Sequence, residues 1–486
     1  MIGITSFGGY LPRLRLERRA IWENLGWRAP EIIFAAGGER SFCNWDEDSL
    51  TMAVSAARDC LLEKSKTKID AVYLCSTTLP FADRLNAGIL KTALNMKDEL
   101  SAVDITSALR AGTIGLKEAY SAVKSGNARE ALVVAADKRL TKTAQLYEMW
   151  FGDGAASVLM GKTDVIAEYL GSYTITCDFV DHYRGWNHTF DYKWEERFVR
   201  DMGYSSMIPK AVEGLLTKLA VPIEKVDKIA FPCLFQSERW KIAKKLGVGP
   251  DIVVSDFQEN LGETGAAHPL VMLVAALEQA QPGERIVVIG FGQGCDALLF
   301  QVTDNIAKLP RNRGIKNSLE RGKSTNNYMK YLNFRGLLPV ETGIRAEAPN
   351  QTAMTVLWRE REMILGLVGG QCKSCGTAQF PRARICVNPA CRATDSQGPY
   401  EFADRKARIK TFTGDMLSVS VDPPNIYGLI QFDGGGRFMA DFTDCDLDEL
   451  QVGARVEMTF RMRYDDQTRG FRGYFWKAVP LPKETS

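Results

Sequence analysis

Four cysteines constrain the possible fold of this chain more than any other feature. Cys372, Cys375, Cys386 and Cys391 are spaced C-x2-C-x10-C-x4-C. Thiolates bind zinc tetrahedrally, and two short knuckles on facing turns give the geometry of a closed structural site. No histidine lies near the quartet, so sulfur would supply all four ligands and no position would remain for a catalytic water. The spacing predicts a structural zinc ribbon; the alternative is four unrelated buried thiols.

Length and charge narrow the class of protein. A chain of 486 residues exceeds what one hydrophobic core usually serves, so we expect two or three domains. With 61 basic and 59 acidic residues, the net charge of +2 favours neither nucleic acid nor membrane binding. We find no leader pattern and no apolar run near the roughly 20 residues that span a bilayer. The other seven cysteines are scattered, which suits a reducing compartment. We expect a soluble, cytoplasmic protein without nucleic-acid or membrane partners.

The first 304 residues alternate apolar strands with amphipathic helices, which is typical of an α/β layered fold. Strands are expected at 71–75, 131–136 and 285–292, and a helix at 49–64. We also find an internal echo. The strand LVVAA and the segment GDGAASVLMG, after Gly126, resemble IVVIG and GQGCDALLFQV, after Gly283. The echo predicts two similar halves with room for a ligand between them; the alternative is chance similarity of two buried strands.

The remaining sequence changes character twice. Residues 305–330 are rich in Lys and Arg and poor in apolar residues, which favours a solvated linker, although a phosphate-rich ligand could use the same cations. A helix is expected at 354–365, before the cysteines, and short strands after them predict a five-stranded OB barrel. An acidic run from Asp441 to Glu449 opposes the nucleic-acid binding common among OB folds. The expected domains are 1–165, 166–304, 305–330, 331–400 and 401–486.

Two family resemblances follow from these motifs. A cysteine quartet, the segment PRAR at 381–384 and a barrel, in this order over 326–484, resemble accessory proteins that associate with thiolases and acyl-CoA enzymes. The resemblance implies a rubredoxin-like ribbon and a barrel that cradle coenzyme A and bridge partner subunits. The cations that we assign to coenzyme A in this context are Arg311, Arg313, Lys316, Arg382 and Arg384.

Residues 1–304 resemble the thiolase superfamily, in its hydroxymethylglutaryl-CoA synthase and ketoacyl synthase III branch. The segments that carry the resemblance are GERSFCNWDEDSLTMAVSAARD, AVDITSALRAGTIGL, WFGDGAASVLMG, NLGETGAAHPL and GFGQGCDALLF. The resemblance implies a duplicated five-layer α/β fold and a homodimer.

The chain departs from this family at its catalytic positions. The family places its nucleophilic cysteine at the amino end of a buried helix, where the local field lowers the thiol pKa. The matching residue here is Leu109. Thr77 stands where the synthases have a glutamate, Pro232 where they have a histidine, and Glu263 where they have an asparagine. We expect that the family mechanism is lost.

Several other residues are weaker candidates. Ser107 is close to the nucleophile position but would point in another direction. The thiols near the expected active-site loops favour packing over catalysis. Glu263 could act as a base if buried, but a carboxylate stabilised at a helix N-terminus is favoured. His268 is expected to pack inside a helix, and the segment containing His182 and His188 either walls the acyl pocket or caps the surface. The four thiols in question are Cys43, Cys75, Cys233 and Cys295.

These patterns predict an acyl-CoA-binding, synthase-like subunit with a degenerate active site. It would act with a separate thiolase subunit in making or breaking a carbon-carbon bond next to a thioester. The alternative is an active acyltransferase that uses an unconventional nucleophile. A nucleic-acid-binding barrel is a third and weaker hypothesis.

Overall fold

The computed structural model describes residues 1–481 except 63, 310–312 and 347–352. The chain forms two compact units. The first comprises Met1–Cys43, Asp48–Gly88 and Lys97–Arg335; the second comprises Asn44–Glu47, Ile89–Met96 and the residues from Gly336 onward. None of the helices in the described ranges has the length and apolar character needed to cross a membrane.

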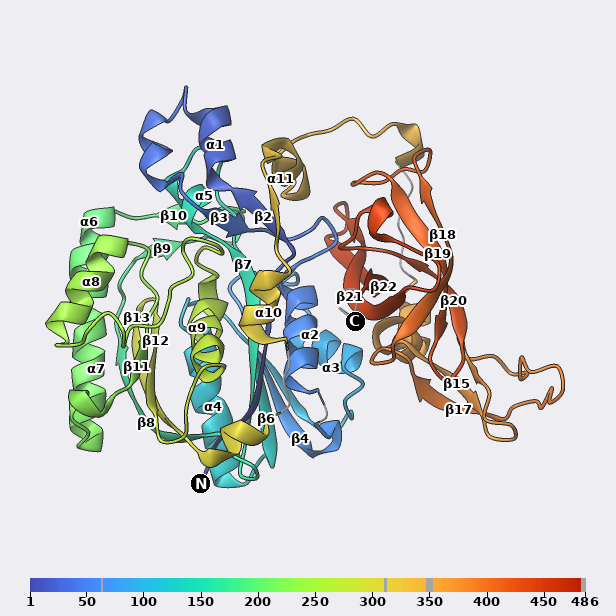
Figure 1. The fold of residues 1–486 in the computed structure, drawn as a ribbon, viewed down its shortest axis with the longest axis horizontal. Helices are drawn as coiled ribbons and strands as arrows, with labels where there is room; N and C mark the ends of the chain where they lie inside the picture. Colours follow the sequence, from blue (N-terminus) through green and yellow to red (C-terminus); the bar gives the residue numbers. More distant parts are fainter. Residues whose placement is uncertain (63, 310–312, 347–352, 482–486) are drawn as a thin grey trace. The chain divides into compact units, whose positions relative to one another are not determined.

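A large mixed sheet organises the first unit (Figure 1). Its strand order is β11-β12-β13-β8-β1-β7-β6-β4-β5 among the described residues. In that order the strands are β11 (Lys228–Ala230), β12 (Arg285–Phe291), β13 (Gly294–Val302), β8 (Ala167–Thr176), β1 (Gly3–Tyr10), β7 (Asp153–Gly161), β6 (Glu130–Lys138), β4 (Ile69–Cys75) and β5 (Ser101–Ile105). A second, small sheet has the order β14-β2-β3, formed by β14 (Lys323–Thr325), β2 (Leu14–Glu17) and β3 (Glu39–Ser41).

Helices cover this sheet in a repeated pattern. The helices of the first unit are α1 (Arg18–Leu25), α2 (Ser49–Cys60), α3 (Asn86–Ala93, shared with the second unit), α4 (Ala111–Ser125), α5 (Leu146–Trp150), α6 (Glu196–Phe198), α7 (Ser205–Leu219), α8 (Gln236–Lys245), α9 (His268–Leu277), α10 (Gly314–Glu320) and α11 (Tyr328–Phe334). Helix α2 packs on β1 and β7, and α7 packs on β8 and β13. Helices α4 and α9 contact each other, α4 against β6 and α9 against β12. The fold therefore has five layers. The central helices α4 and α9 lie between the two halves of the large sheet, and α2 and α7 cover the outer faces.

The internal echo corresponds to a structural duplication. In one half β4 runs parallel to β6, which pairs antiparallel with β7; in the other half β11 runs parallel to β12, which pairs antiparallel with β13. Gly126 and Gly283, which precede β6 and β12, both have positive φ, at 83° and 91°. Glycine adopts this conformation at little cost. The predicted duplicated α/β fold is confirmed.

Burial on both faces explains the apolar strands and the apolar central helix. Every residue of α9 is buried, because the helix lies between the two halves. Every residue of β7 is buried too, which removes the alternation expected of a strand with one wet face. Helix α2 begins at a capping box, in which the Asp48 carboxylate accepts from the Thr51 N–H at 2.9 Å.

The described part of residues 305–330 is not a free linker. It contains α10 and β14, and β14 pairs in parallel with β2 of the first unit. Ile315 is fully buried, and the Asp59 carboxylate accepts from the backbone N–H groups of Arg313 and Gly314, both at 2.8 Å. Few apolar residues suffice because the partly buried Asp59 carboxylate anchors the backbone. The unit boundary follows Arg335 instead.

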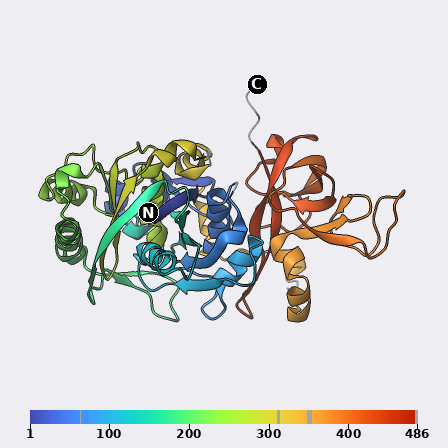
Figure 2. The same cartoon turned by 90° about the horizontal axis from the view of Figure 1, so that it is seen from below.

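The second unit contains a small sheet of order β16-β15-β17 and a barrel sheet of order β20-β19-β18-β21-β22, drawn orange to red (Figure 2). An isolated bridge between Phe442 and Ala478 links the ends of the barrel sheet, as closure requires. The elements are α12 (Met354–Arg359), α13 (Arg361–Gly366), β15 (Val368–Cys372), β16 (Ala378–Gln379), β17 (Gln397–Glu401), β18 (Ala407–Asp415), β19 (Asn425–Phe432), β20 (Arg437–Asp441), β21 (Arg455–Asp466) and β22 (Phe471–Pro480).

The alternating segment LSVSV does not form a strand in this barrel. Residues 417–421 alternate apolar and polar side chains but form bends instead. The Asp415 carboxylate accepts from the N–H groups of Leu417 and Ser418, at 2.8 and 3.1 Å, which makes a turn. Leu417 is 91% exposed. An alternating pattern forms a strand only where a neighbouring surface buries one face.

The segment Asn44–Glu47 belongs to the second unit although it lies near the start of the sequence. Asp46 and Glu47 are fully buried there. The Lys477 ammonium lies 2.8 Å from Asp46, and Arg461 pairs with Glu47. Because a buried charge is stable only when paired, these ion pairs fix the segment in the unit.

Candidate functional site

Leu109 lies where the two halves of the first unit meet. It follows β5, just before α4 begins at Ala111, and it is 9% exposed. The backbone of Gly292, between β12 and β13, packs against it: a Cβ at Gly292 would lie 2.9 Å from the Leu109 backbone nitrogen. The start of one central helix and a glycine loop of the other half therefore converge on a hydrocarbon side chain.

The next residue, Arg110, ties these two loops together. Its Nε donates to the Gly292 carbonyl at 3.1 Å, and its Nη1 lies 3.2 Å from the Asp296 carboxylate. Lys117 approaches the other oxygen of Asp296 at 2.8 Å. Asp296 is fully buried, so its charge is compensated inside the protein. Arg110 and Asp296 stand in the SALRAGT and GQGCDALLF segments, but no spacing along the chain marks them as a pair.

Glu263 belongs to a chain of alternating buried charges. Arg139 Nη1 lies 2.6 Å from the Glu263 carboxylate, and Arg139 Nη2 lies 2.9 Å from Asp191. Arg184 approaches Asp191 at 2.6 Å and donates a second hydrogen bond to the Thr77 carbonyl oxygen. Burial alone would raise the pKa of Asp191, but the charges of Arg139, His182 and Arg184 together outweigh burial and hold that pKa below its usual value. The network thereby connects two of the four substituted catalytic positions.

The expected role of Glu263 needs correction. Its carboxylate is 4% exposed and already paired with Arg139, so it is not available as a free base. It does not act as a helix-terminal carboxylate either, since its side-chain partner is a guanidinium and α9 begins only at His268. The sequence signal for a basic partner of Glu263 was the charged run Asp137-Lys138-Arg139 at the end of β6.

The Thr77 side chain is engaged in a second buried network. Its hydroxyl and its backbone N–H donate to the Asp137 carboxylate at 2.9 and 2.8 Å, and Ser76 and Thr78 donate to the same group. The Ala266 N–H completes the set at 2.7 Å. Burial raises the pKa of Asp137 despite these bonds. The hydroxyl of Thr77 therefore anchors a loop and cannot replace a glutamate as an acid.

Burial raises the pKa of three thiols beside this region. Pro232 is followed by Cys233, whose pKa burial raises to about 12. Burial also raises the pKa values of Cys75 and Cys295, and Cys43 is fully buried. A thiol attacks as the thiolate, so these side chains are poor nucleophiles.

Ser107 and His268 do not form a nucleophile and base pair. Ser107 is exposed in a left-handed conformation with φ of 77°. His268 is the first residue of α9 and is fully buried; burial lowers its pKa to about 4, so the ring is neutral. His182 Nδ1 lies 2.7 Å from Asp181, its charge partner. His188 is exposed.

A buried glutamate in α5 predicts a pH dependence of stability. Burial raises the pKa of Glu148 to about 7, and the Tyr328 hydroxyl donates to it at 2.9 Å. The folded state thus holds a proton that the unfolded chain releases near pH 4.5. This group therefore stabilises the fold below about pH 4.5, and its contribution of about 3 kcal/mol is lost as pH rises through about 7. Glu148→Gln should gain stability relative to the native chain between pH 5 and 7.5, measured by urea unfolding. The exposed variant Glu31→Gln should show no such gain; equal behaviour of the two variants contradicts the prediction.

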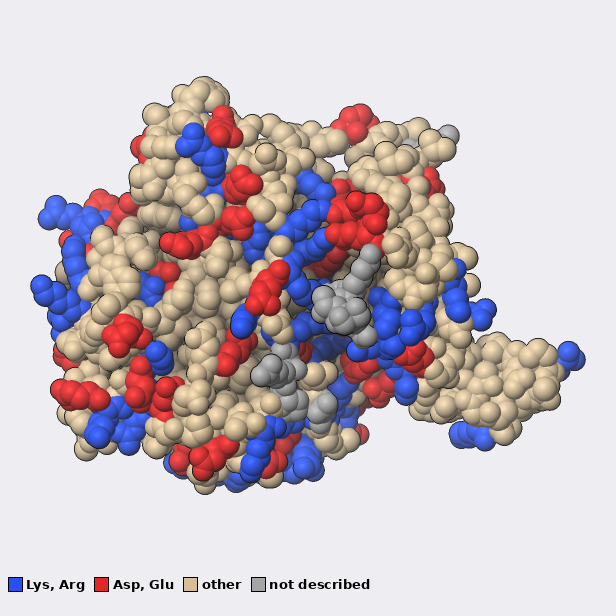
Figure 3. Space-filling model, in the orientation of Figure 1, with Lys and Arg blue, Asp and Glu red and all other residues tan. Residues whose placement is uncertain are grey.

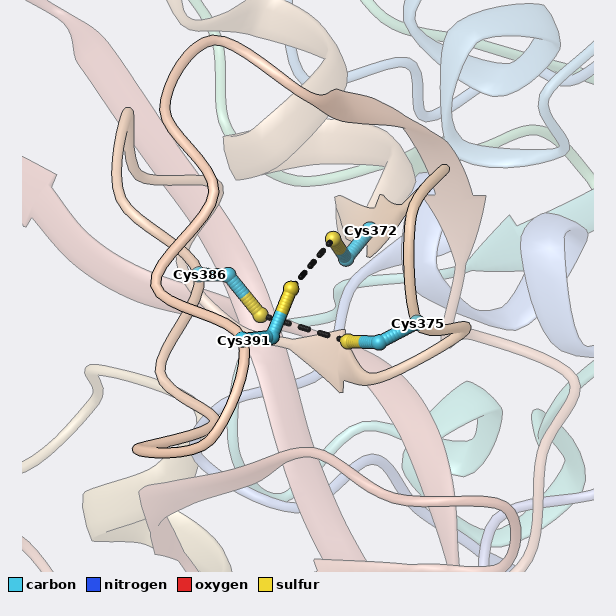
Figure 4. A group of neighbouring side chains, drawn as sticks. All are labelled: Cys372, Cys375, Cys386 and Cys391. Atoms are coloured by element: carbon cyan, nitrogen blue, oxygen red, sulfur yellow. Dashed lines mark hydrogen bonds between the residues drawn. The ribbon is translucent and has the colours of Figure 1, made fainter.

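The four cysteines converge in the second unit (Figure 4). All four sulfur atoms lie within 4.8 Å of one another, with Sγ to Sγ distances of 3.9 Å for Cys372 and Cys391 and 3.6 Å for Cys375 and Cys386. A hydrogen bond with the Ser396 hydroxyl lowers the pKa of Cys372 to about 6. For Cys386 the Asn388 amide lowers the pKa, but desolvation and the neighbouring sulfurs together outweigh it and raise the pKa to about 12. Four thiolates could lie so close only around a cation, so the convergence of the four sulfur atoms fits the predicted four-sulfur site.

The cations assigned to coenzyme A divide between the units. Arg313 and Lys316 belong to the first unit, and Arg382 and Arg384 belong to the second. Arg311 lies outside the described residues. Arg384 pairs with Asp395 at 2.9 Å. On the face drawn in Figure 3, both basic and acidic side chains are spread over the surface.

Comparison with known families defines the class. The family model of 3-oxoacyl-[acyl-carrier-protein] synthase III matches residues 103–178, and that of its C-terminal part matches 216–301. The ChsH2 rubredoxin-like zinc ribbon matches 364–396 and the ChsH2 C-terminal OB fold matches 400–461. The chain is thus a thiolase-like α/β protein fused to a zinc ribbon and an OB fold.

Curated relatives then show the family. The hydroxymethylglutaryl-CoA synthase of Archaeoglobus fulgidus is 31% identical over 341 residues, which cover 69% of this chain and 98% of that protein. The corresponding synthase of Methanopyrus kandleri is 30% identical over 324 residues, covering 63% and 89%. The chain belongs to the hydroxymethylglutaryl-CoA synthase family.

Solved structures agree with the fold. A hydroxymethylglutaryl-CoA synthase complexed with CoA has a TM-score of 0.62 at 18% identity, covering 71% of this chain and 92% of that one. The synthase III of Pseudomonas aeruginosa has a TM-score of 0.56 at 21% identity, covering 62% and 98%.

Proposed function

We propose that this chain is an acyl-CoA-binding, synthase-like subunit whose own active site is degenerate. It acts with a separate thiolase in making or breaking a carbon-carbon bond next to a thioester. The observation that carries the proposal is Leu109, a hydrocarbon side chain at the start of α4 where the family has its nucleophile. The buried pairing of Glu263 with Arg139 supports it, because that carboxylate serves as the partner of a buried guanidinium.

Several observations support a subunit that binds acyl-CoA and assembles with other subunits but does not itself catalyse the reaction. A relative of the same fold has been solved as a complex with CoA, so this fold can hold the ligand. The strand β5 is an edge of the large sheet, and Val103 on it is 40% exposed. An unpaired edge can extend a sheet across a two-fold axis, which supports the homodimer. The four-cysteine site would hold a structural zinc and supply no catalytic step.

The proposal predicts that the chain takes no acyl group. After incubation with radiolabelled acetyl-CoA and acid quench, intact-mass analysis should find no covalent adduct, while equilibrium dialysis shows acyl-CoA binding. Leu109→Cys should bring back an adduct at that position, because the thiol would then lie at the amino end of a helix. Leu109→Ser is the matched control for size and polarity. A stoichiometric adduct on any Cys or Ser of the native chain refutes the scaffold role.

The second half of the proposal concerns the thiolase partner. Tagged full-length chain, isolated from its native cell at low salt, should carry a thiolase subunit in fixed ratio. A chain that is homodimeric and free of any thiolase under these conditions contradicts the assembly.

A second candidate function is an active acyltransferase with an unconventional nucleophile. The exposed, strained Ser107 favours it, since left-handed backbone at a non-glycine residue often marks a functional loop. An acyl adduct that Ser107→Ala abolishes would establish it.

A further inference from the structure

Four polar side chains of the first unit have no role in the function proposed above. They are the adjacent pair Asp181 and His182 and the phenols of Tyr147 and Tyr204. They come from three elements: β9 (His182–Tyr183) with the residue before it, α5, and a π-helical turn over Val199–Tyr204. Such turns are rare and are frequently found at functional sites.

This group lies beside two of the four substituted catalytic positions. The Tyr204 ring packs on that of Phe291, with 4.4 Å between the ring centroids. Phe291 directly precedes the glycine that packs against Leu109. On the other side, Arg184, just after β9, donates to the backbone carbonyl of Thr77. The four side chains are thus placed where the two halves of the unit converge.

Asp181 and His182 have the arrangement of a general base. His182 Nδ1 lies 2.7 Å from the Asp181 Oδ2 atom. Asp181 is 6% exposed, and its other oxygen, Oδ1, has no partner among the described residues. A carboxylate at Nδ1 holds the ring proton there and leaves a lone pair on Nε2. The Nε2 atom makes no hydrogen bond within the described part of the chain, and the His182 side chain is 14% exposed.

Tyr147 and Tyr204 supply two hydrogen-bond donors. Their side chains are buried, at 4% and 6% exposed. Neither hydroxyl is bonded to another residue in the described ranges, and neither is sealed from solvent. Burial raises the pKa of both phenols, and the charge of Asp181 raises both further. Both hydroxyls therefore keep their protons, as donors to an oxyanion must.

Backbone pairing and side-chain contacts hold the base close to the phenols. Strand β9 pairs antiparallel with β10 (Tyr192–Lys193), which sets His182 opposite Lys193. The Lys193 ammonium lies 6.0 Å from the centroid of the Tyr147 ring in α5 (Figure 1). Tyr147 in turn is near enough to Tyr204 to affect its pKa. One proton acceptor and two donors are thereby gathered in one place.

We propose that these side chains catalyse proton transfer at the α-carbon of a bound acyl-CoA. Acyl transfer needs a nucleophile, which Leu109 does not supply, whereas proton removal needs only a base and a site for an oxyanion. His182 Nε2 takes the α-proton. The electron pair of the broken C–H bond forms the C=C bond of an enolate, and the carbonyl π pair moves to the oxygen.

The remaining groups have distinct parts in this step. The hydroxyls of Tyr147 and Tyr204 donate to the enolate oxygen, and Asp181 is a positioning residue that orients the His182 ring. Return of a proton from Nε2 to the α-carbon regenerates the thioester, so no other reactant is consumed. The inference goes beyond the proposed function but rests on the acyl-CoA binding that it contains.

Deuterium exchange into acetyl-CoA tests this site. The full, zinc-loaded chain, freed of any thiolase, is incubated with acetyl-CoA in heavy water, and mass spectrometry measures deuterium in the acetyl group. The native chain should exchange faster than a blank without protein. Tyr204→Phe, which removes only a hydroxyl, should slow the exchange roughly 100-fold. His182→Ala should slow it roughly 100-fold, and added imidazole should restore it, which a merely structural role of His182 does not predict.

The controls separate this inference from the proposed function. Tyr183→Phe and His188→Ala make matched changes at exposed positions of the same segment and should exchange as the native chain does. Equilibrium dialysis of acetyl-CoA checks that each variant is folded and binds. If the native chain binds acetyl-CoA but exchanges no faster than the blank, or if Tyr204→Phe and His182→Ala exchange at the native rate, the inference is wrong while acyl-CoA binding stands. If acetyl-CoA does not bind, the proposed function fails together with the inference.

Discussion

Cys386→Ser is expected to abolish zinc binding and to unfold the ribbon of the second unit. The ribbon sheet is small: β15 and β17 have five residues each and β16 has two. So little structure cannot bury a self-sufficient core. In such modules the metal supplies the folding energy, with apparent zinc-binding free energies of about 10–16 kcal/mol at neutral pH. Losing one of the four ligands removes most of this zinc-binding free energy.

The measurement is zinc per chain by elemental analysis, combined with limited proteolysis between residues 368 and 401. The native chain should hold one zinc and resist cleavage, and the variant should hold none and be cut. Cys445→Ser is the matched control, because it removes a thiol of the same unit that is not part of the quartet. A variant that lacks metal yet resists cleavage as the native chain does would show that the ribbon folds without it.

Arg139→Met should strongly destabilise the first unit. Arg139 is 2% exposed, and its guanidinium pairs with Glu263 and Asp191, which are each 4% exposed. Removing one partner of a buried ion pair leaves an uncompensated charge, at a cost of about 3–5 kcal/mol. Asp191 keeps Arg184 as a partner, so the uncompensated buried charge is mainly that of Glu263.

This assignment makes a specific prediction for the double variant. Arg139→Met with Glu263→Gln removes both charges, so it should be more stable than Arg139→Met alone. Urea unfolding followed by circular dichroism gives the free energies, and zinc release reports the second unit separately. Arg19→Met, which breaks an exposed pair with Glu23, should have little effect. If the double variant is no more stable than the single one, the cost comes from lost packing and not from the buried carboxylate.

The sequence alone determined the features that depend on local spacing. The cysteine quartet predicts its own convergence because two short knuckles leave few geometries. Strand and helix periodicity, together with the echo around Gly126 and Gly283, predicted the duplicated α/β layers. Leu109 could be identified as a departure because its neighbours match a known motif.

Tertiary structure decided what depends on pairs far apart in the chain. Arg139 and Glu263 are 124 positions apart, and Asp46 and Lys477 are 431 apart. A buried charge chooses its partner by distance in space and by the cost of desolvation, neither of which leaves a periodic trace in sequence. The same reason explains why residues 305–330 looked like a linker: the carboxylate of Asp59 that anchors them lies more than two hundred and fifty residues earlier. Spacing along the chain therefore determines local features such as the cysteine quartet. The partners of buried charges are determined only when the layers of the fold pack together.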